Sequence, residues 1–278
     1  MGRIETQIDK IYLSIAKDLL YAPIVNGTRE LNNVKLQLLD IDDNIVSVRG
    51  ISDTYLFGEL LWYFTGRNHT DFISSFSKMW KRLSDDGVTN NSAYGFLMKH
   101  AHEFDQIEKV IELLTKDPTS RRAVINLNVP NRNVIETKDE PCTIALQFLI
   151  RNEKLHCTAM MRSNDIWFGL PYDVAFFTEL QKYIADRLKV GYGVYTHFVT
   201  SLHMYERDFD KIYELVKNPV SNKIRFNRDN FHEHAEFIAD LIDTAIDHEV
   251  DAKEMLLKLL DMYEIYHREE DQYERKTD

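Results

Sequence analysis

Within the first 217 residues of this 278-residue chain, apolar residues recur with two different spacings, and no Pro-, Gly- or Ser-rich linker divides this part of the chain. Apolar residues three and four apart share one face of a helix, whereas apolar residues two apart share one face of a strand. Because the helical and strand-like segments are interspersed without strict alternation, we expect an α+β fold with a mainly antiparallel or mixed sheet packed by helices. The predicted helices lie near residues 104–114, 176–184 and 209–216. The predicted strands are residues 123–127, 142–150, 155–161 and 195–205.

The helical pattern pauses at residues 218–229 and returns over residues 231–266, where its spacing predicts a helical hairpin or one long helix. We therefore expect residues 1–217 to form one domain and residues 218–278 to form a helical C-terminal extension. The segment from Asp229 to the end holds 16 acidic and five basic residues, a net charge of −11 that equals the charge of the whole chain. We interpret this extension as an acidic, solvated face over an apolar stripe, in preference to a tail that binds a basic partner.

Charge and composition exclude several classes of protein. The first 228 residues are neutral overall, so the chain lacks the broad basic face that coats nucleic acid, although a local cationic pocket is compatible with this balance. No apolar run approaches the ~18 residues of a membrane span, and the first ten residues lack the apolar core of a signal peptide. We expect a cytoplasmic protein in which Cys142 and Cys157 are free thiols, and we assign no metal site.

Glu59 is the one charged residue in the segment 54–64 (TYLFGELLWYF), which is typical of a largely buried helix. Burial would raise the pKa of this carboxyl and suit it to moving protons through water. A structural glutamate held by a buried donor explains the pattern equally well.

Cys142 follows Pro141 at the start of a predicted strand, and Arg121, Arg122 and Arg162 are cations that could stabilise its thiolate. From composition alone an inert buried cysteine is the favoured interpretation, because buried free cysteines are common.

Asp173 follows Pro171 in the first turn of a predicted helix, where the helix dipole favours an ionised carboxylate. A capping role and a contact to a ligand are equally compatible with that position. His203 and Tyr205 are two apart on a predicted strand, so they share one face and could hydrogen-bond one ligand group. A hydrogen-bonded pair in the core is the alternative.

Seven short motifs occur in one order and spacing, and together they resemble the thymidylate synthase family over about residues 23–217. The motifs are residues 59–62 (ELLW), 93–95 (AYG), 117–122 (DPTSRR), 141–142 with 147–148 (PC and QF), 162–165 (RSND), 169–173 (GLPYD) and 203–205 (HMY). Each motif alone is a weak signal, but seven in register argue strongly against coincidence. The resemblance implies a thymidylate-synthase-like mixed sheet packed by helices, and it favours a functional role for the residues singled out above.

By this resemblance, Cys142 is the nucleophile that adds to C6 of a pyrimidine nucleotide, whose C5 then attacks the methylene of 5,10-methylenetetrahydrofolate. Glu59 and Tyr94 resemble the residues that organise water and remove the C5 proton. Asp165 resembles the contact to the folate pterin. The residues that resemble contacts to a sugar hydroxyl are His203 and Tyr205.

Arg162 and Ser163 resemble ligands of the nucleotide phosphate, and the resemblance also puts Arg162 beside the thiol. Asn164 belongs to the same motif and is included among the substrate-binding residues. Arg121 and Arg122 match the pair that family dimers donate to the neighbouring subunit's phosphate, so the resemblance implies a homodimer. Guanidinium groups suit a phosphate dianion because their paired N–H donors match its oxygens.

Asp173 is the most informative departure, because family members that use uridylate carry Asn at this position. An amide donates to O4 and accepts from N3–H of uracil, whereas an ionised carboxylate can only accept. Asp173 therefore matches the 4-amino group of cytosine, and a mismatched buried hydrogen bond can reject the wrong base by ~10⁴-fold. Asp at this position resembles the cytidylate hydroxymethylases of the family.

Three further departures affect the expected chemistry. The family's histidine after the nucleophile is Thr143 here, Arg29 is a candidate replacement for the amino-terminal phosphate arginine, and the acidic extension replaces the short closing segment. We expect transfer of a one-carbon unit to C5 of dCMP or CMP, giving the 5-hydroxymethyl product. The alternatives are reductive methylation of dUMP, as in a thymidylate synthase, and a non-catalytic protein that binds a pyrimidine nucleotide.

Overall fold

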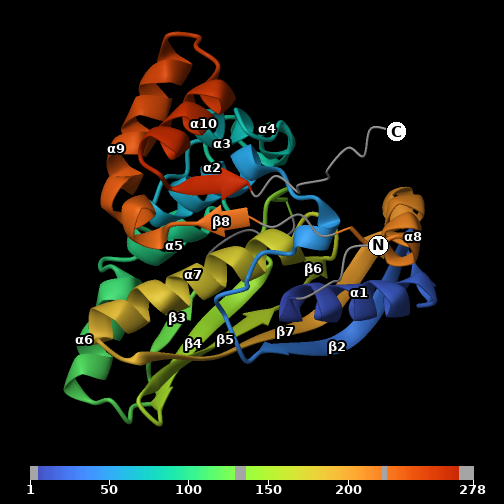
Figure 1. The fold of residues 1–278 in the computed structure, drawn as a ribbon, viewed down its shortest axis with the longest axis horizontal. Helices are drawn as coiled ribbons and strands as arrows, with labels where there is room; N and C mark the ends of the chain where they lie inside the picture. Colours follow the sequence, from blue (N-terminus) through green and yellow to red (C-terminus); the bar gives the residue numbers. More distant parts are fainter. Residues whose placement is uncertain (1–5, 129–135, 221–223, 269–278) are drawn as a thin grey trace, which may run out of the picture.

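The computed structural model describes residues 6–128, 136–220 and 224–268, and its centre is a β-sheet with helices packed against it (Figure 1). The strands are β1 (Ile24–Val25), β2 (Thr28–Leu38), β3 (Val124–Asn126), β4 (Thr143–Arg151), β5 (Lys154–Met161), β6 (Asn164–Asp165), β7 (Gly191–Tyr205), β8 (Ile224–Phe226) and β9 (Tyr266–Arg268). The α-helices are α1 (Gln7–Leu20), α2 (Asp53–Phe64), α3 (Thr70–Ser74), α4 (Met79–Leu83), α5 (Tyr94–Lys99), α6 (Gln106–Lys116), α7 (Leu170–Leu188), α8 (Phe209–Lys217), α9 (Arg228–Asp247) and α10 (Ala252–Met262). Short 3₁₀ turns lie at Ser47–Arg49 and Glu206–Asp208.

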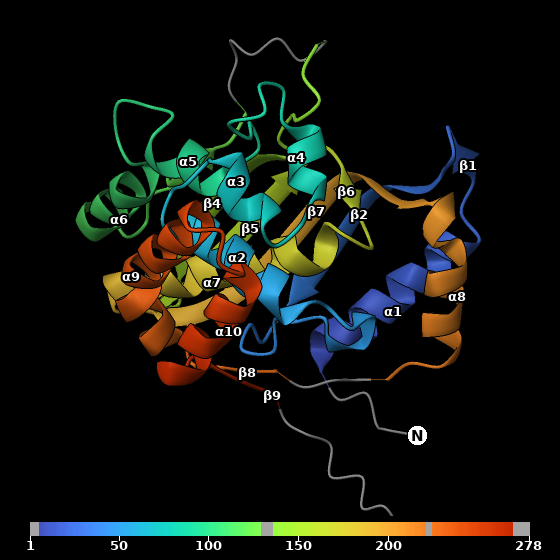
Figure 2. The same cartoon turned by 90° about the horizontal axis from the view of Figure 1, so that it is seen from above.

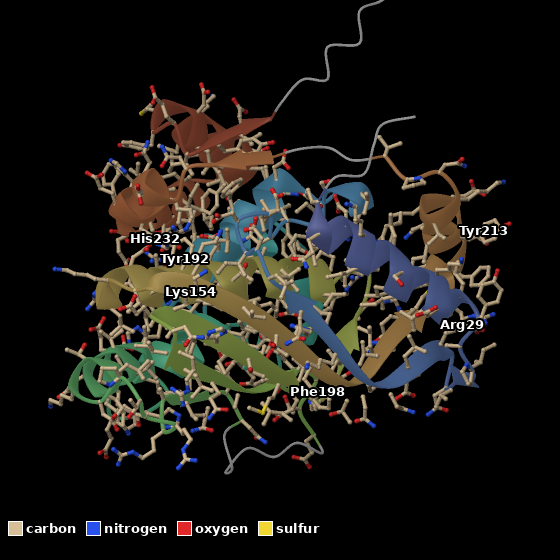
Figure 3. The ribbon with its side chains drawn as sticks, turned by 60° about the horizontal axis from the view of Figure 1, so that its bottom comes forward. Arg29, Lys154, Tyr192, Phe198, Tyr213 and His232 are labelled. Atoms are coloured by element: carbon tan, nitrogen blue, oxygen red, sulfur yellow. The ribbon has the colours of Figure 1, made fainter. Side chains whose placement is uncertain are left out.

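The sheet has the strand order β1-β2-β7-β5-β4-β3, and β6 pairs with the end of β7. β5 runs parallel to β7, whereas β2 with β7, β4 with β5 and β3 with β4 are antiparallel. The sheet is therefore mixed, which confirms the α+β fold predicted from the sequence. Along β7, Tyr195, His197 and Val199 are fully buried, and Phe198, which points to the other face, is half-buried (Figure 3).

The predicted helices correspond to α6, α7 and α8, and the predicted strands correspond to β3, β4, β5 and β7. Local signals set the helix ends: Asp105 accepts the N–H groups of Ile107 and Glu108 at the start of α6. Pro171 occupies the first turn of α7, and Asp173 lies in the same turn, as predicted.

Residues 7–38 contain three elements that the sequence pattern did not predict: α1, the short β1 and β2. β2 pairs with β7 along nearly its whole length. Its register is the same on both sides of Asn33, at the pairs Asn32↔Ser201 and Val34↔Val199, although the φ of 57° at Asn33 lies in the left-handed region. The two consecutive polar residues Asn32 and Asn33 interrupt the apolar alternation by which a strand is recognised in a sequence.

The C-terminal extension is a hairpin of α9 and α10 rather than one long helix. α9 packs against α2 and α3, and α10 packs against α2 (Figure 2). Arg67, which follows α2, forms ion pairs with Glu236, Asp240 and Asp243 on one face of α9. Three acidic residues of α9 therefore form ion pairs with the segment that follows α2.

Within the described residues, no helix combines the length and the apolar character that a bilayer crossing requires. No group of three or more His, Cys, Asp or Glu side chains in the same part of the chain could hold a metal ion. Cys142 and Cys157 are both free thiols.

Candidate active site

Cys142 lies directly before β4 and Arg162 directly after β5, and the antiparallel pairing of these strands brings the two residues together. Arg162 Nη2 lies 3.9 Å from Cys142 Sγ. The same guanidinium donates to the carbonyl oxygens of Pro141, at 3.1 Å, and Glu140, at 2.8 Å. These two bonds hold the cation beside the thiol, in agreement with the prediction for Arg162.

Burial raises the pKa of the Cys142 thiol to about 11, and the charge of Arg162 opposes this rise. Arg121 and Arg122, which the sequence analysis offered as further cations for the thiolate, have exposed side chains. Among the described residues of one chain, Arg162 is the cation that lowers the Cys142 pKa. Because burial is the larger effect, the thiol stays protonated at neutral pH until further positive charge reaches it.

Glu59 lies in the middle of α2 and is 6% exposed. Two phenols on the same helix face, four residues before and four residues after it, donate to Glu59 Oε1: Tyr55 at 2.7 Å and Tyr63 at 3.5 Å. The indole N–H of Trp80 donates in turn to the Tyr55 hydroxyl at 3.0 Å. Both phenols bind the same carboxylate oxygen, so Oε2 is the oxygen that can address water or a substrate.

Burial raises the pKa of Glu59 to about 8, the bonds from Tyr55 and Tyr63 lower it, and the charge of Asp173 raises it. The desolvation predicted for this carboxyl is therefore present. A carboxyl with a pKa near neutrality can both take up and release a proton at physiological pH, which suits acid–base chemistry.

Tyr94 begins α5, and its ring stacks between the rings of Tyr63 and Phe177, with centroids at 5.1 Å and 5.6 Å. Gly95 makes this arrangement possible, because a Cβ atom there would lie 1.9 Å from the carbonyl oxygen of Tyr63. Only glycine allows α5 to approach α2 so closely. Gly95 of the AYG motif thus allows Tyr94 to pack against α2, the helix that carries Glu59.

Asp173 accepts a hydrogen bond of 2.6 Å from Nδ2 of Asn164, which lies on β6 and is 2% exposed. Gly169 leaves room for this contact, since a Cβ atom there would lie 2.6 Å from Asn164 Nδ2. Burial raises the pKa of Asp173 to about 7, and the bond from Asn164 lowers it. Asp173 is therefore a carboxyl that receives one hydrogen bond from a buried amide. The donor, Asn164, is itself one of the predicted substrate-binding residues.

The charge of Asp173 raises the pKa values of Glu59, Tyr94 and Cys142. Such an influence is strong only at short range, so these four side chains face a common space. They come from α7, α2, α5 and the start of β4. The structure therefore brings together residues that are up to 114 positions apart in the sequence.

A second group lies where β6 pairs with the end of β7. Ser163 Oγ is 3.4 Å from His203 Nδ1, and the rings of His203 and Tyr205 meet edge to face at 5.2 Å. Burial raises the pKa of Asp165, while the N–H of Trp167 donates to its carboxylate at 2.8 Å and the nearby His203 lowers the pKa. His203, which was predicted with Tyr205 to bind a sugar hydroxyl, therefore lies beside Asp165, the predicted contact to the pterin.

Thr143 and Arg29 stand where the sequence departs from the family pattern, and the structure shows what each of them contacts. Thr143 is fully buried, and its side chain lies close enough to the Tyr94 phenol to lower the pKa of that group, against the larger rise that burial causes. Arg29 donates to the carbonyl oxygens of Leu20 and Ala22, and its guanidinium lies 4.9 Å from the centre of the Phe209 ring. These contacts give Arg29 a structural role that needs no phosphate.

Sequence reasoning missed the side chains that support the site. Tyr55 and Tyr63 bind Glu59, and Tyr195 and His197 on β7 connect to Asn164. Their spacing was the available signal: four residues on either side of Glu59 on a helix, and two residues apart on a strand.

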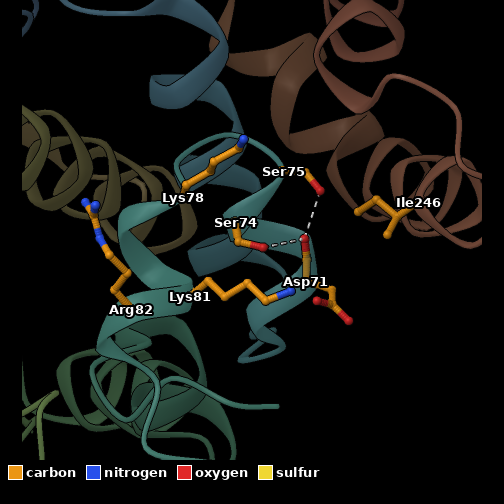
Figure 4. Close-up of a pocket in the computed structure, with 7 residues that line it drawn as sticks. All are labelled: Asp71, Ser74, Ser75, Lys78, Lys81, Arg82 and Ile246. Carbon is orange, nitrogen blue, oxygen red and sulfur yellow. Dashed lines mark hydrogen bonds between the residues drawn. The ribbon is translucent and has the colours of Figure 1, made fainter. Parts of the chain in front are cut away.

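A second cationic feature lies apart from these residues (Figure 4). It is a surface pocket of about 590 Å³ between α3, α4 and α9, and none of the predicted site residues lines it. Its lining residues are Asp71, Ser74, Ser75, Lys78, Lys81, Arg82 and Ile246.

Known proteins resemble this chain over much of its length. A deoxyuridylate hydroxymethyltransferase of Bacillus phage SP01 is 33% identical over 174 residues, which cover 58% of this chain and 45% of that protein. A deoxyuridylate hydroxymethyltransferase of Pseudomonas phage M6 is 31% identical over 169 residues, covering 59% of this chain and 48% of that protein. The chain thus matches about half the length of each phage relative.

A thymidylate synthase of Clostridium beijerinckii is 27% identical over 226 residues, which cover 77% of this chain and 84% of that enzyme. The thymidylate synthase family model matches residues 26–248, which extend from the first strands of the sheet to the end of α9. This match covers well over half of the chain. The chain therefore belongs to the thymidylate synthase family.

Proposed function

We propose that this protein transfers a one-carbon unit from 5,10-methylenetetrahydrofolate to C5 of a cytidine monophosphate, dCMP or CMP, and releases the 5-hydroxymethyl nucleotide. The observation that carries the proposal is the carboxyl of Asp173, which lies near enough to Cys142 to raise the pKa of that thiol and accepts a hydrogen bond from Asn164. An ionised carboxylate accepts from the 4-amino group of cytosine and is repelled by the 4-keto oxygen of uracil.

Cys142 starts the proposed reaction. Its thiolate forms a bond to C6, and the electron pair of the C5–C6 double bond moves to C5 and the ring, so that C5 becomes nucleophilic. The folate supplies the electrophilic methylene carbon to which C5 bonds. Asp173 stabilises the activated ring through the 4-amino group, and also through N3 when that atom carries a proton.

Glu59 and Tyr94 are proposed to organise water and to remove the proton from C5. The C5 proton leaves through Glu59, and the bond between the transferred carbon and the folate nitrogen breaks, so that tetrahydrofolate departs and C5 carries an exocyclic methylene. Water then adds its oxygen to this methylene carbon and gives up one proton, and departure of the Cys142 sulfur from C6 as thiolate restores the C5–C6 double bond. The net reaction consumes one water and yields the hydroxymethyl nucleotide and tetrahydrofolate. Two observations support this role: both phenol hydrogen bonds go to Oε1 of Glu59, which leaves Oε2 without a partner among the described residues, and the pKa of the carboxyl is about 8.

The folate pterin is proposed to lie at Asp165, which is paired with His203 on the neighbouring strand. Asp165 presents a carboxylate, which matches the N–H donors of a pterin ring. His203 and Tyr205, whose rings touch, would bind a sugar hydroxyl of the nucleotide.

A homodimer is part of this proposal. Arg162 and Ser163 would bind the nucleotide phosphate from one chain, and the exposed Arg121 and Arg122 would reach the phosphate from the partner chain. Their added positive charge would lower the pKa of Cys142 from about 11 and favour the thiolate when substrate is in place.

Deoxyuridylate hydroxymethylation is a second candidate, and two observations favour it. Two of the phage relatives bear that name. In addition, the pKa of Asp173 is about 7, so a fraction of the carboxyl is protonated at neutral pH and could donate to O4 of uracil. Reductive methylation, the activity named for the Clostridium beijerinckii relative, is a third candidate, and it would yield dihydrofolate.

One experiment separates these candidates. The full chain is incubated with the folate and with dCMP, CMP or dUMP labelled with tritium at C5, and release of tritium is followed while the product is weighed by mass spectrometry. We expect release from a cytidine nucleotide and a product heavier by CH₂O. Preference for dUMP would overturn the base assignment, and a product heavier by CH₂ with dihydrofolate would overturn hydroxymethylation. Cys142→Ser is the control that should abolish release.

A further inference from the structure

Asp173 stands at one end of a chain of hydrogen bonds through the interior. Tyr195 Oη lies 2.7 Å from His197 Nδ1, His197 Nε2 lies 3.2 Å from Asn164 Oδ1, and Asn164 Nδ2 lies 2.6 Å from Asp173 Oδ2. Tyr195 and His197 are fully buried, and Asn164 is 2% exposed. Solvent therefore does not replace these bonds, and each member depends on the next for its partner.

The ionisation of the buried members fixes the direction of this chain. Burial raises the pKa of Tyr195 well above its ordinary value, so the hydroxyl keeps its proton. Burial lowers the pKa of His197 to about 3, so the imidazole is neutral and carries a single N–H. Among the described residues, His197 Nδ1 is the hydrogen-bond partner of the Tyr195 hydroxyl. Nδ1 therefore accepts, and Nε2 carries the hydrogen.

This tautomer fixes the amide of Asn164. The Nε2–H of His197 donates to Asn164 Oδ1, which leaves Nδ2 turned toward Asp173. An amide N–H favours an ionised carboxylate. The opposite amide orientation would set Oδ1 against Asp173 and require the carboxyl to carry a proton, and a protonated carboxyl can donate to a 4-keto group.

We infer that Tyr195 and His197 are positioning residues for base selection, an inference that takes its substrate from the proposed function. They hold the Asn164 amide in the orientation that presents Asp173 to the base as an acceptor, and they act through Asn164. Neither residue was singled out by its sequence context, and the cytidine preference of the site depends on both.

The charge of Asp173 also influences other ionisable groups, and all of them keep their side chains in the His197 variants used to test the inference. They are Glu59 and Tyr63 on α2, Tyr94 on α5, Cys142 before β4 and Tyr195 on β7. A difference between wild type and a His197 variant therefore reports the hydrogen-bond chain.

The first measurement needs no nucleotide. Carbon-13 NMR of the Asp173 carboxyl gives its titration midpoint in the full-length protein, and His197→Leu should raise that midpoint by about one pH unit because the amide loses its fixed orientation. His197→Gln should restore the wild-type midpoint, because its side chain can accept from Tyr195 and donate to Asn164. Val199→Ala, buried on the same face of β7, is the matched packing control and should leave the midpoint unchanged.

The second measurement uses the substrates. At pH 7 the ratio of kcat/KM for dCMP to that for dUMP should fall ~10-fold in His197→Leu, which is the factor that corresponds to one pH unit. The ratio should stay within ~3-fold of wild type in His197→Gln and in Val199→Ala. If His197→Leu does not fold, Tyr195→Phe, which removes one hydroxyl, should shift both readouts in the same direction by ~3-fold.

A folded His197→Leu protein with the wild-type midpoint and ratio would overturn the inference, and so would an equal shift in Val199→Ala. If the wild-type protein acts on neither nucleotide, the proposed function fails, and the NMR titration still decides whether His197 orients the amide beside Asp173.

Discussion

Glu59 and Asp173 are two carboxyl groups that face the same space with different donors. Glu59 receives two phenol O–H groups from its own helix, whereas Asp173 receives one amide N–H from a residue on another element. Burial raises both pKa values, to about 8 for Glu59 and about 7 for Asp173.

The difference lies in what each donor allows. A phenol hydroxyl rotates and can also accept, so Tyr55 tolerates a change in the protonation of Glu59. The Asn164 amide is held at its oxygen by His197 and presents only N–H to Asp173. One carboxyl is therefore suited to moving a proton, and the other is suited to recognising a base with a fixed charge.

Asp173→Asn should have the largest effect on base choice. The amide can donate to O4 of uracil, so we expect the dCMP-to-dUMP ratio of kcat/KM to fall by ~10³-fold or more. Steady-state kinetics with both nucleotides measure the ratio. Asp9→Asn, a buried aspartate that holds Ser47 and Val48, is the control: its thermal stability should drop with the ratio unchanged. An unchanged ratio in Asp173→Asn would mean that this carboxyl does not read the base.

Glu59→Gln should reduce turnover of every nucleotide by ~10²- to 10³-fold, because an amide cannot take up the C5 proton. Nucleotide affinity, measured by calorimetry, should change little. Glu179→Gln provides a comparison, since Glu179 is equally buried but pairs with Lys182 and Arg228 away from the site. That variant should unfold at a lower temperature and keep its turnover within ~3-fold; equal losses in both variants would make Glu59 a structural residue.

A change of pH from 6 to 8 should raise the dCMP-to-dUMP ratio of kcat/KM by ~100-fold, because the ratio of ionised to protonated Asp173 changes tenfold for each pH unit. Asp173 loses its proton as the pH rises through about 7, so the preference for dCMP over dUMP should increase from pH 6 to pH 8. Both substrates share Glu59, so its own titration cancels in the ratio. A ratio that stays constant across this range would show that ionisation of Asp173 does not govern the choice.

Tyr55→Phe should have the smallest effect. The phenol lowers the pKa of Glu59, so its removal should raise that pKa and move the acid limb of the kcat profile to higher pH. We expect a ~3- to 10-fold loss of turnover at pH 7 that is recovered near pH 9. Tyr63→Phe, whose hydroxyl lies 3.5 Å from the same oxygen, should shift the limb less. A loss that persists at high pH would contradict this assignment.

The sequence predicted the elements whose apolar period is regular. The helix around Glu59 and the strands on either side of Cys142 and Arg162 appear where the pattern put them. β2 escaped prediction because the consecutive polar residues Asn32 and Asn33 break its apolar alternation. Local periodicity reports one element at a time, so it missed a strand whose pairing tolerates an irregular residue.

For the site, motif order selected the candidate residues but did not predict what surrounds them. The contact of Arg162 with Cys142 follows from strand pairing, which a sequence read by itself does not fix. The exposure of Arg121 and Arg122, and the high pKa of Cys142, depend on burial in the folded chain. Desolvation is a property of the assembled core, so it could be expected for Glu59 only because its whole helix is apolar.

A crystal structure of the protein with dCMP would show whether Cys142 and Asp173 bind the same base. We expect C6 of the base to lie against Cys142 Sγ and the 4-amino group to donate to the Asp173 carboxylate. A base bound far from Cys142, or turned so that its 4-amino group points away from Asp173, would rule out the proposed recognition of cytosine.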